Sequence, residues 1–298
     1  MAEPRRSVEW PTLALLMACY VAWGVSVFWL AAIWLPVGFV ATTFLIALHS
    51  SLTHEMIHGH PFRSDRLNEI IGFPCLGLMV PYRRFKDLHI AHHNDETLTD
   101  PYDDPETNYL DPEVWARQPR WIQSLLRFNN TLLGRILIGP AIGYTAFLAA
   151  DIRAMRAGNR QVTLAWALQI VSVALVLTLV WWSPMPVWAY LVAAYLGYGI
   201  IKIRTFLEHR AHEQAGGRTA IVEDRGLLSF LFLNNNLHVV HHMHPRVAWY
   251  DLPALYRADR DAYLQRNDSY VYQSYGQIFR EHFLHAKDPV PHPLWPRR

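Results

Sequence analysis

Residues 37 to 58 read VGFVATTFLIALHSSLTHEMIH, an apolar run that ends in two histidines four positions apart. A hydrocarbon core of ~30 Å needs about 20 apolar residues per helix, so this stretch predicts a transmembrane helix with His54 and His58 at its end. Residues three or four apart share one face of a helix. The pair is therefore expected to present two imidazoles together at the edge of a membrane.

Three further apolar runs extend this prediction to two helical hairpins. One run precedes the first stretch, with a turn at Pro36, and the other two are parted only by Ser183 and Pro184. The first run is too long for the apolar region of a cleavable signal peptide and continues directly into the next. We predict an all-α integral membrane protein, a single domain over residues 1–298, with four transmembrane helices at about 11–35, 37–57, 162–182 and 185–207.

The distribution of Lys and Arg predicts the orientation. Neither occurs between residues 7 and 62, and no charged residue occurs between Gln161 and Ile201. By the positive-inside rule, both termini and the segments 58–161 and 208–298 are expected in the cytoplasm, the latter as a helical cap. Two shorter apolar stretches, 70–82 and 136–150, fit interfacial or re-entrant segments better than spans.

Histidine spacing predicts a metal centre. Besides the pair at 54 and 58, the chain holds two clusters of the form H-x-x-H-H, at residues 89–93 and 238–242, and a separate His209. On a helix each cluster is expected to aim two or three imidazoles at one point. Nine histidines are too many for one tetrahedral zinc site, whereas two metals fit the count. The candidate ligands are His54, His58, His89, His92, His93, His209, His238, His241 and His242.

The boxes H-E-M-I-H, H-I-A-H-H and H-V-V-H-H, at the ends of two hairpins, resemble those of the integral-membrane fatty acid desaturase and hydroxylase superfamily, in its bacterial branch. The resemblance covers about residues 37–260. It implies two irons held by the three boxes and by one further histidine just past the fourth helix, for which His209 fits better than His212. It also implies a bacterial inner-membrane protein with a cytoplasmic active site.

The function that the resemblance implies is an O₂-dependent oxidoreductase. It would desaturate or hydroxylate a C–H bond of a fatty acyl, lipid or other alkyl-bearing substrate, with the irons carrying the chemistry and the protein positioning them. Because no cytochrome b5-like domain or flavin fingerprint is visible, electrons are expected from an external ferredoxin or rubredoxin with its reductase. No nucleic-acid partner is expected.

Two other functions stay open on the residues alone. In the motif H-E-x-x-H two histidines bind zinc and the glutamate, here Glu55, activates water, which predicts an intramembrane zinc metalloprotease using His54 and His58. A non-enzymatic metal or haem protein with bis-histidine ligation is the third class. Both leave most of the clustered histidines without a role.

Polar residues near the boxes are candidates to accept the free N–H of a metal-bound imidazole. For any single aspartate the alternative is a solvated acidic loop. His49, on the apolar second helix, is expected to be a hydrogen-bonded lining residue, since polar groups in a span usually face the protein interior. The candidate acceptors are Asn236, Asp95 and Asp100, with Asp87, Asp103 and Asp104 nearby. Three further histidines are expected to be neighbours of the boxes: His60, His212 and His244.

Overall fold

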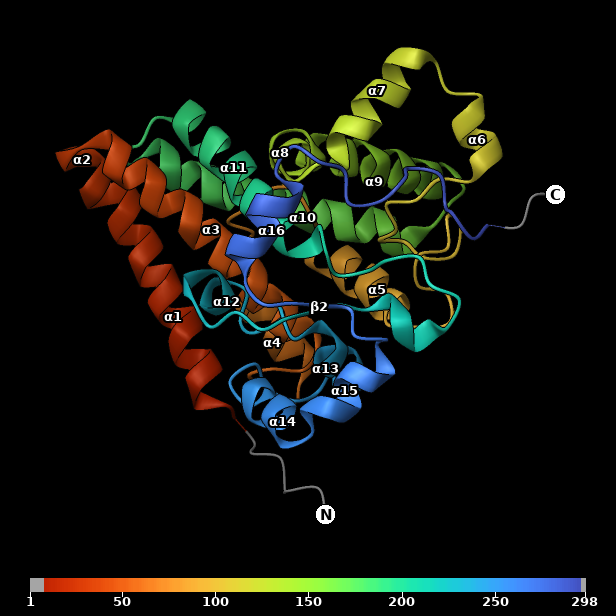
Figure 1. Ribbon diagram of the computed structural model, residues 1–298. Coiled ribbons are helices and arrows are strands. Elements are labelled where there is room, and N and C mark those ends of the chain that lie inside the picture. Colours follow the sequence, from red (N-terminus) through yellow and green to blue (C-terminus); the bar gives the residue numbers. More distant parts are fainter. Residues whose placement is uncertain (1–7, 296–298) are drawn as a thin grey trace. The chain divides into compact units, whose positions relative to one another are not determined.

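The structure is a computed structural model that describes residues 8–295. Within that range the chain is mostly helical, and its one sheet has two short strands, so the expectation of an all-α fold is confirmed. The chain forms two compact units, shown together in Figure 1: unit 1 is Met1–Lys86 with Ile142–Ile200, and unit 2 is Asp87–Ala141 with Ile201–Arg298. The single-domain expectation stays a prediction.

Unit 1 contains the long apolar helices. The first begins as α1 and continues through a π-helical turn, η1, into α2. The chain then reverses and returns as α3, which lies beside α1 (Figure 1). The elements are α1 (Trp10–Val25), η1 (Ser26–Leu30), α2 (Ala31–Ile33), α3 (Leu35–Ile57), α4 (Asp65–Ile71) and α10 (Arg160–Trp181), with parts of α5 (Tyr82–His92), α9 (Gly139–Arg156) and α11 (Val187–Thr205).

The reversal between α2 and α3 depends on a close approach of two backbones. Trp34 is extended, and Pro36 occupies the first turn of α3, where its missing N–H costs no hydrogen bond. A Cβ atom at Gly38 would lie only 2.6 Å from the backbone nitrogen of Ala31. Glycine at this position therefore allows the two helices to close into the predicted hairpin.

In the described part of the chain, three helices are long and apolar enough to cross a membrane: Trp10–Ile33, Leu35–Ile57 and Arg160–Trp181. Their ends lie within two residues of the first three predicted spans. The fourth predicted span corresponds to α11, whose last turn contains Lys202 and Arg204. The count of four spans therefore stays a prediction.

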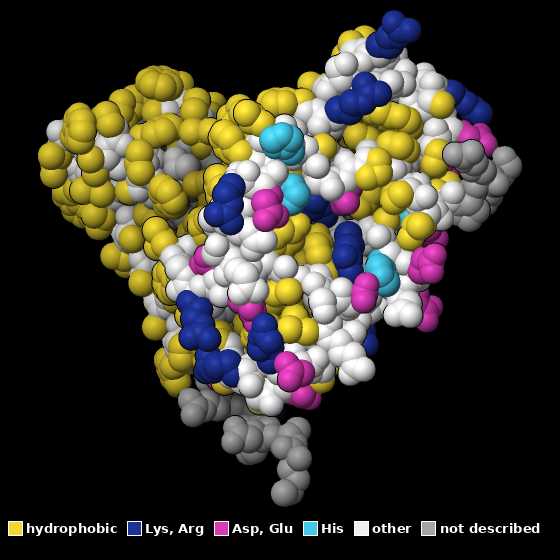
Figure 2. Space-filling model, viewed as in Figure 1, with side chains coloured by type: hydrophobic (Ala, Val, Ile, Leu, Met, Phe, Trp, Pro, Cys, Tyr) yellow, Lys and Arg dark blue, Asp and Glu magenta, His cyan; other side chains and the backbone are white. Residues whose placement is uncertain are grey.

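The apolar helices of unit 1 carry hydrophobic side chains on the faces that line the core and on the faces at the surface. In the core, the indole N–H of Trp23 donates to the hydroxyl of Tyr190 (3.1 Å), which donates to the carbonyl of Leu76 (2.8 Å). Hydrophobic side chains also cover the surface over α1, α2 and α3 (Figure 2). A helix that is apolar on all sides is typical of a membrane span. Large exposed side chains include Ile33, Trp34, Trp181, Trp182 and Trp188.

Residues 72–81, most of the first short apolar stretch, form no helix. Side chains of α10 satisfy their backbone: the hydroxyl of Ser172 donates to the carbonyl of Phe73, and the amide of Gln169 donates to the carbonyl of Leu78 (2.9 Å). Irregular backbone is tolerated in apolar surroundings only where the protein supplies such partners. This segment is therefore built into unit 1.

Unit 2 consists of short helices and loops. Strands β1 (Ile221–Val222) and β2 (Val271–Tyr272) are parallel, and β1 packs with α13 and α14 around an apolar core that includes Val240 and Leu252. The second short apolar stretch, 136–150, falls in α8 and α9. The other helices are α6 (Pro112–Ala116), α7 (Arg120–Asn129), α8 (Leu132–Leu137), η2 (Ala215–Arg218), α12 (Leu227–Leu231), α13 (His238–Met243), α14 (Leu252–Ala258), α15 (Arg260–Arg266) and α16 (Tyr275–His282).

Candidate metal centre

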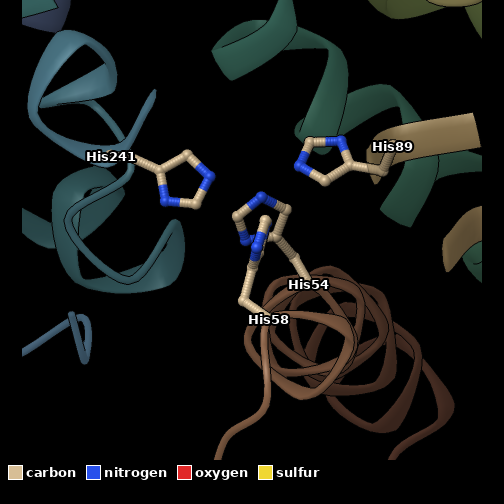
Figure 3. Close-up of side chains that lie close together, drawn as sticks. All are labelled: His54, His58, His89 and His241. Carbon is tan, nitrogen blue, oxygen red and sulfur yellow. The ribbon is translucent and has the colours of Figure 1, made fainter. Parts of the chain in front are cut away.

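The histidine clusters lie at helix ends. In unit 1, His54 and His58 end α3, with ring centroids 4.8 Å apart (Figure 3). In unit 2, the second cluster ends α5, the third forms most of α13, and His209 follows α11. Seven of the nine predicted ligands therefore belong to unit 2 and two to unit 1.

Four histidines of unit 2 converge through one ring nitrogen each, all within 4.8 Å of one another. The Nε2 atom of His209 lies 2.9 Å from Nε2 of His92 and 3.2 Å from Nε2 of His238. The buried Nε2 of His242 has no hydrogen-bond partner among the described residues. We call this group set A: His92, His209, His238 and His242.

The other nitrogen of each ring in set A contacts an oxygen atom. Carboxylate and amide oxygens accept hydrogen bonds. An imidazole whose Nδ1 contacts such an oxygen therefore carries its ring proton on Nδ1, and the lone pair of its Nε2 faces the centre of the set. Lone pairs brought together in this way repel unless a cation lies between them. The Nδ1 contacts are His92 to Asp104 (2.7 Å), His238 to Asn235 (2.9 Å), His209 to Thr219 (3.3 Å) and His242 to Asp95 (3.3 Å).

A second group in unit 2, set B, also brings Nε2 atoms together. Nε2 of His93 lies 3.0 Å from Nε2 of His89 and 3.1 Å from Nε2 of His241, and Nδ1 of His89 contacts Glu106 at 2.9 Å. Figure 3 shows His89 and His241 facing each other from α5 and α13. The rings of His93 and His242 stack with centroids 4.3 Å apart, so the two sets are adjacent.

Each H-x-x-H-H cluster is divided between the two sets, so each aims two imidazoles at one set and its third imidazole at the other. In the second cluster His89 and His93 join set B while His92 joins set A, and the third cluster is divided in the reverse sense. The reason is helical geometry, because successive residues are rotated by about 100°. Residues i and i+4 are then about 40° apart, whereas i+3 and i+4 are about 100° apart.

The electrostatics of set A combine imidazoles that burial keeps neutral with nearby carboxylates that stabilise positive charge. Burial, together with the neighbouring histidines, holds the pKa of His209 well below its usual value. Burial also lowers the pKa of His92, but Glu106 and Asp104 outweigh it and raise that pKa to about 9. Burial raises the pKa of Glu106, but His92 and His89 outweigh it and hold that pKa well below its usual value. The surroundings therefore favour a cation.

These residues fit a metal. The Nε2 atoms of each set face one another, and the opposite nitrogens of set A and of His89 contact oxygen atoms, as is usual for metal-ligating histidines. Imidazole suits iron, zinc, copper and nickel alike. Sets A and B can therefore hold metal, and the donor atoms alone do not name the element.

The three residues that were predicted to accept from the ligand imidazoles differ in what they contact. Asp95 contacts His242 and also accepts from Arg266 at 2.7 Å. Asp100 accepts from backbone nitrogens of its own loop. The amide nitrogen of Asn236 donates to backbone carbonyls, at 2.6 Å for that of Val222, and its neighbour Asn235 is the residue that contacts His238.

Histidines outside the two sets have other partners. His49 contacts the hydroxyl of Tyr20 at 3.1 Å, as expected of a lining residue. His212 contacts Asp268 at 3.3 Å, whereas His209 belongs to set A.

Sequence reasoning missed three contributors to the centre. Asn235 and Glu106 lie near the boxes but just outside the residues that spacing singled out. Lys287 is 78 positions from His209, yet its Nζ donates to the carbonyl of His209 at 2.6 Å. No local signal in the sequence marks Lys287, because the contact is made only by the folded chain.

The described residues thus combine helices long and apolar enough to cross a membrane with two histidine sets that resemble metal sites. A family model for fatty acid desaturases matches residues 28–274, which is most of the chain and includes all nine histidines. The protein belongs to the fatty acid desaturase family, as the resemblance implied, and membership together with the apolar helices associates it with a membrane.

One curated relative is an omega-3 fatty acid desaturase of the endoplasmic reticulum from Nicotiana tabacum. It is 20% identical over 230 residues, which cover 67% of this chain and 58% of that protein. The chain therefore matches somewhat more than half the length of this relative.

Proposed function

We propose that this protein is an O₂-dependent oxidoreductase that desaturates or hydroxylates a C–H bond of a fatty acyl, lipid or other alkyl-bearing substrate. The observation that carries the proposal is the convergence of Nε2 atoms in sets A and B, with acceptors holding the opposite nitrogens of set A. Family membership supports this type of chemistry.

Two irons are the proposed cofactors, with the nine histidines as ligands. Set A supplies four ligands for one iron, and set B supplies three for the other. His54 and His58 are also proposed as ligands, since their i, i+4 spacing is the one that unites two imidazoles within each cluster of unit 2. Asp95 is proposed to orient His242, while Asn236 and Asp100 act on the surrounding backbone.

Bound iron would supply the reaction of O₂ with an unactivated C–H bond, which side-chain acid–base chemistry cannot provide. The protein's own residues would hold the imidazoles neutral and oriented. Asp104 and Asn235 keep the ring protons of His92 and His238 on Nδ1, and Lys287 holds the backbone of His209 in place.

The substrate and partners follow from the membrane setting. A hydrophobic chain is the proposed substrate because unit 1 is apolar both inside and outside. The electron donor is proposed to be a separate ferredoxin or rubredoxin with its reductase, acting at the cytoplasmic face of a bacterial inner membrane. The positive-inside distribution of Lys and Arg supports this orientation.

The metalloprotease alternative is not favoured. Glu55, which would have to activate a water molecule, is only 3% exposed. The alternative also gives no role to the seven convergent histidines of unit 2, and the family match is to desaturases.

Metal analysis of the purified full-length protein tests the proposal. Protein from iron-57-supplied cells should contain about two irons per chain, with a coupled Mössbauer signature. Lipid profiles of expressing cells should gain a desaturated or hydroxylated product that a His92→Ala variant fails to make. One zinc and no iron after growth with ample iron would instead support the protease.

A further inference from the structure

Glu106 contacts members of both histidine sets. Its Oε1 atom lies 2.9 Å from Nδ1 of His89, which belongs to set B, and its Oε2 atom lies 3.9 Å from Nε2 of His92, which belongs to set A. Nε2 is the inward-facing nitrogen of His92, because Nδ1 of the same ring contacts Asp104. One carboxylate thus orients an imidazole of one set and approaches the ligand nitrogen of the other.

Asp104, two residues earlier in the same loop, shows what an orienting carboxylate looks like. Its Oδ1 contacts Nδ1 of His92 and accepts from the backbone nitrogen of Glu106, and its Oδ2 accepts from the backbone nitrogen of Thr99 at 2.8 Å. Both of its oxygens therefore have partners on the outer side of set A. The Oε2 atom of Glu106 lies instead on the side of the ligand nitrogen.

The distance between Oε2 and Nε2 of His92 suits two ligands of one metal ion. Two donor atoms each about 2.1 Å from a metal are about 3.0 Å apart at a right angle and about 4.2 Å apart when opposite. The observed 3.9 Å lies within this range. A contact of that length is too long for a direct hydrogen bond.

The loop that carries Glu106 is held in a defined conformation. Thr99 has a φ of 71°, which is rare for a β-branched residue and needs support from its surroundings. That support comes from Asp104 and from Arg218, whose guanidinium donates to the carbonyls of Glu96 (2.9 Å) and Leu98 (3.0 Å). The Glu106 carboxylate is therefore presented by a fixed backbone.

We propose that Glu106 is a carboxylate ligand: Oε2 binds the metal ion held by set A, while Oε1 orients His89 of set B. This inference rests on the proposed two-metal function, and it makes the centre a mixed histidine and carboxylate site. An anionic ligand also offsets part of the positive charge that two divalent ions bring into a buried site.

Cobalt binding to the metal-free full-length protein in detergent tests this assignment, because the visible spectrum of Co²⁺ reports its ligands. Glu106→Gln keeps an amide oxygen for His89 but removes the anionic ligand. We expect weaker binding of one Co²⁺, by more than the loss of an orienting residue causes, and a shifted absorption band. Asp103→Asn is the matched control, because Asp103 is an exposed carboxylate of the same loop, and this variant should keep the wild-type band shape.

A wild-type spectrum in Glu106→Gln, or the same shift in both variants, would overturn the assignment. Should Glu106→Gln fail to fold, the wild type still decides the question: binding of Co²⁺ should shift a carboxylate band in the infrared difference spectrum, and an unshifted band overturns the proposal. A wild type that binds only one Co²⁺ per chain refutes the two-metal function. The spectrum of that one ion then shows whether Glu106 is its ligand.

Discussion

Both units bury polar side chains, but these side chains contact different kinds of group. In unit 1, Gln169 and Ser172 donate to backbone carbonyls of residues 72–81. In unit 2, Asp104 and Asn235 contact imidazoles and leave the opposite ring nitrogens facing each other. Buried polar atoms normally find partners within the protein, so a buried cluster that leaves lone pairs opposed indicates a ligand. The first arrangement completes a fold, and the second resembles a metal site.

The largest expected difference between the two units is in metal binding. His238→Ala removes one of the four nitrogens of set A, so we expect loss of the iron held there and of turnover, measured by elemental analysis and product profiling. His49→Ala is the matched control in unit 1, because the His49 side chain is also buried but its ring contacts the hydroxyl of Tyr20. Full activity in two or more variants of the nine histidines would refute the ligand assignment.

Orienting residues should have a smaller effect than ligands. Asp104→Ala removes the acceptor for Nδ1 of His92, and loss of such a partner typically weakens metal binding about 10- to 100-fold. Competition with a chelator measures this change. Asp103→Ala, an exposed neighbour in the same loop, should bind metal as the wild type does. Equal affinities for the two variants would remove Asp104 from the centre.

Lys287 links the polar network of unit 2 to the position of His209. Lys287→Met leaves the buried carbonyl of His209 without this donor, which costs about 1–3 kcal/mol and should lower both the unfolding temperature and iron retention. Lys86→Met is the control, since the ion pair of Lys86 with Asp65 is largely exposed and worth about 0–1 kcal/mol. Unchanged iron retention in Lys287→Met would show that His209 is positioned by other contacts.

The smallest effect on metal binding is expected from a substitution in unit 1. Ser172→Ala removes the hydrogen bonds to the carbonyl of Phe73 and the backbone nitrogen of Cys75, at a cost of about 1–3 kcal/mol. Thermal unfolding in detergent should show this loss, while the iron content stays at the wild-type value. Loss of iron in Ser172→Ala would contradict the division of roles between the two units.

Much of the fold was predictable because its signals are local. Long apolar runs mark the spans, and Pro36 and Gly38 mark the reversal that separates two of them. The non-helical segment 72–81 was predictable only as too short to span, because its partners on α10 lie about 90 to 100 residues away in the chain.

The candidate site was predictable in its residue types and not in its geometry. Histidine spacing pointed to six of the seven members of the two sets, since residues three or four apart share a helix face, and the family resemblance pointed to His209. The division of each cluster between two sets needed the orientation of α5 relative to α13 within unit 2. Glu106 lies in an acidic loop in which several carboxylates are equivalent by sequence, and only the backbone shows which of them reaches an imidazole.

The contact between Lys287 and the carbonyl of His209 sets an order for biosynthesis. The apolar helices α1 and α3 leave the ribosome early and can enter the membrane while the rest of the chain is still being made. Set A needs residues from 92 to 242, and its loop at His209 is secured only when residue 287 has been added. Under the proposed function, iron loading is therefore a step that follows synthesis of residue 287, and a stalled chain that ends before it inserts without a completed centre.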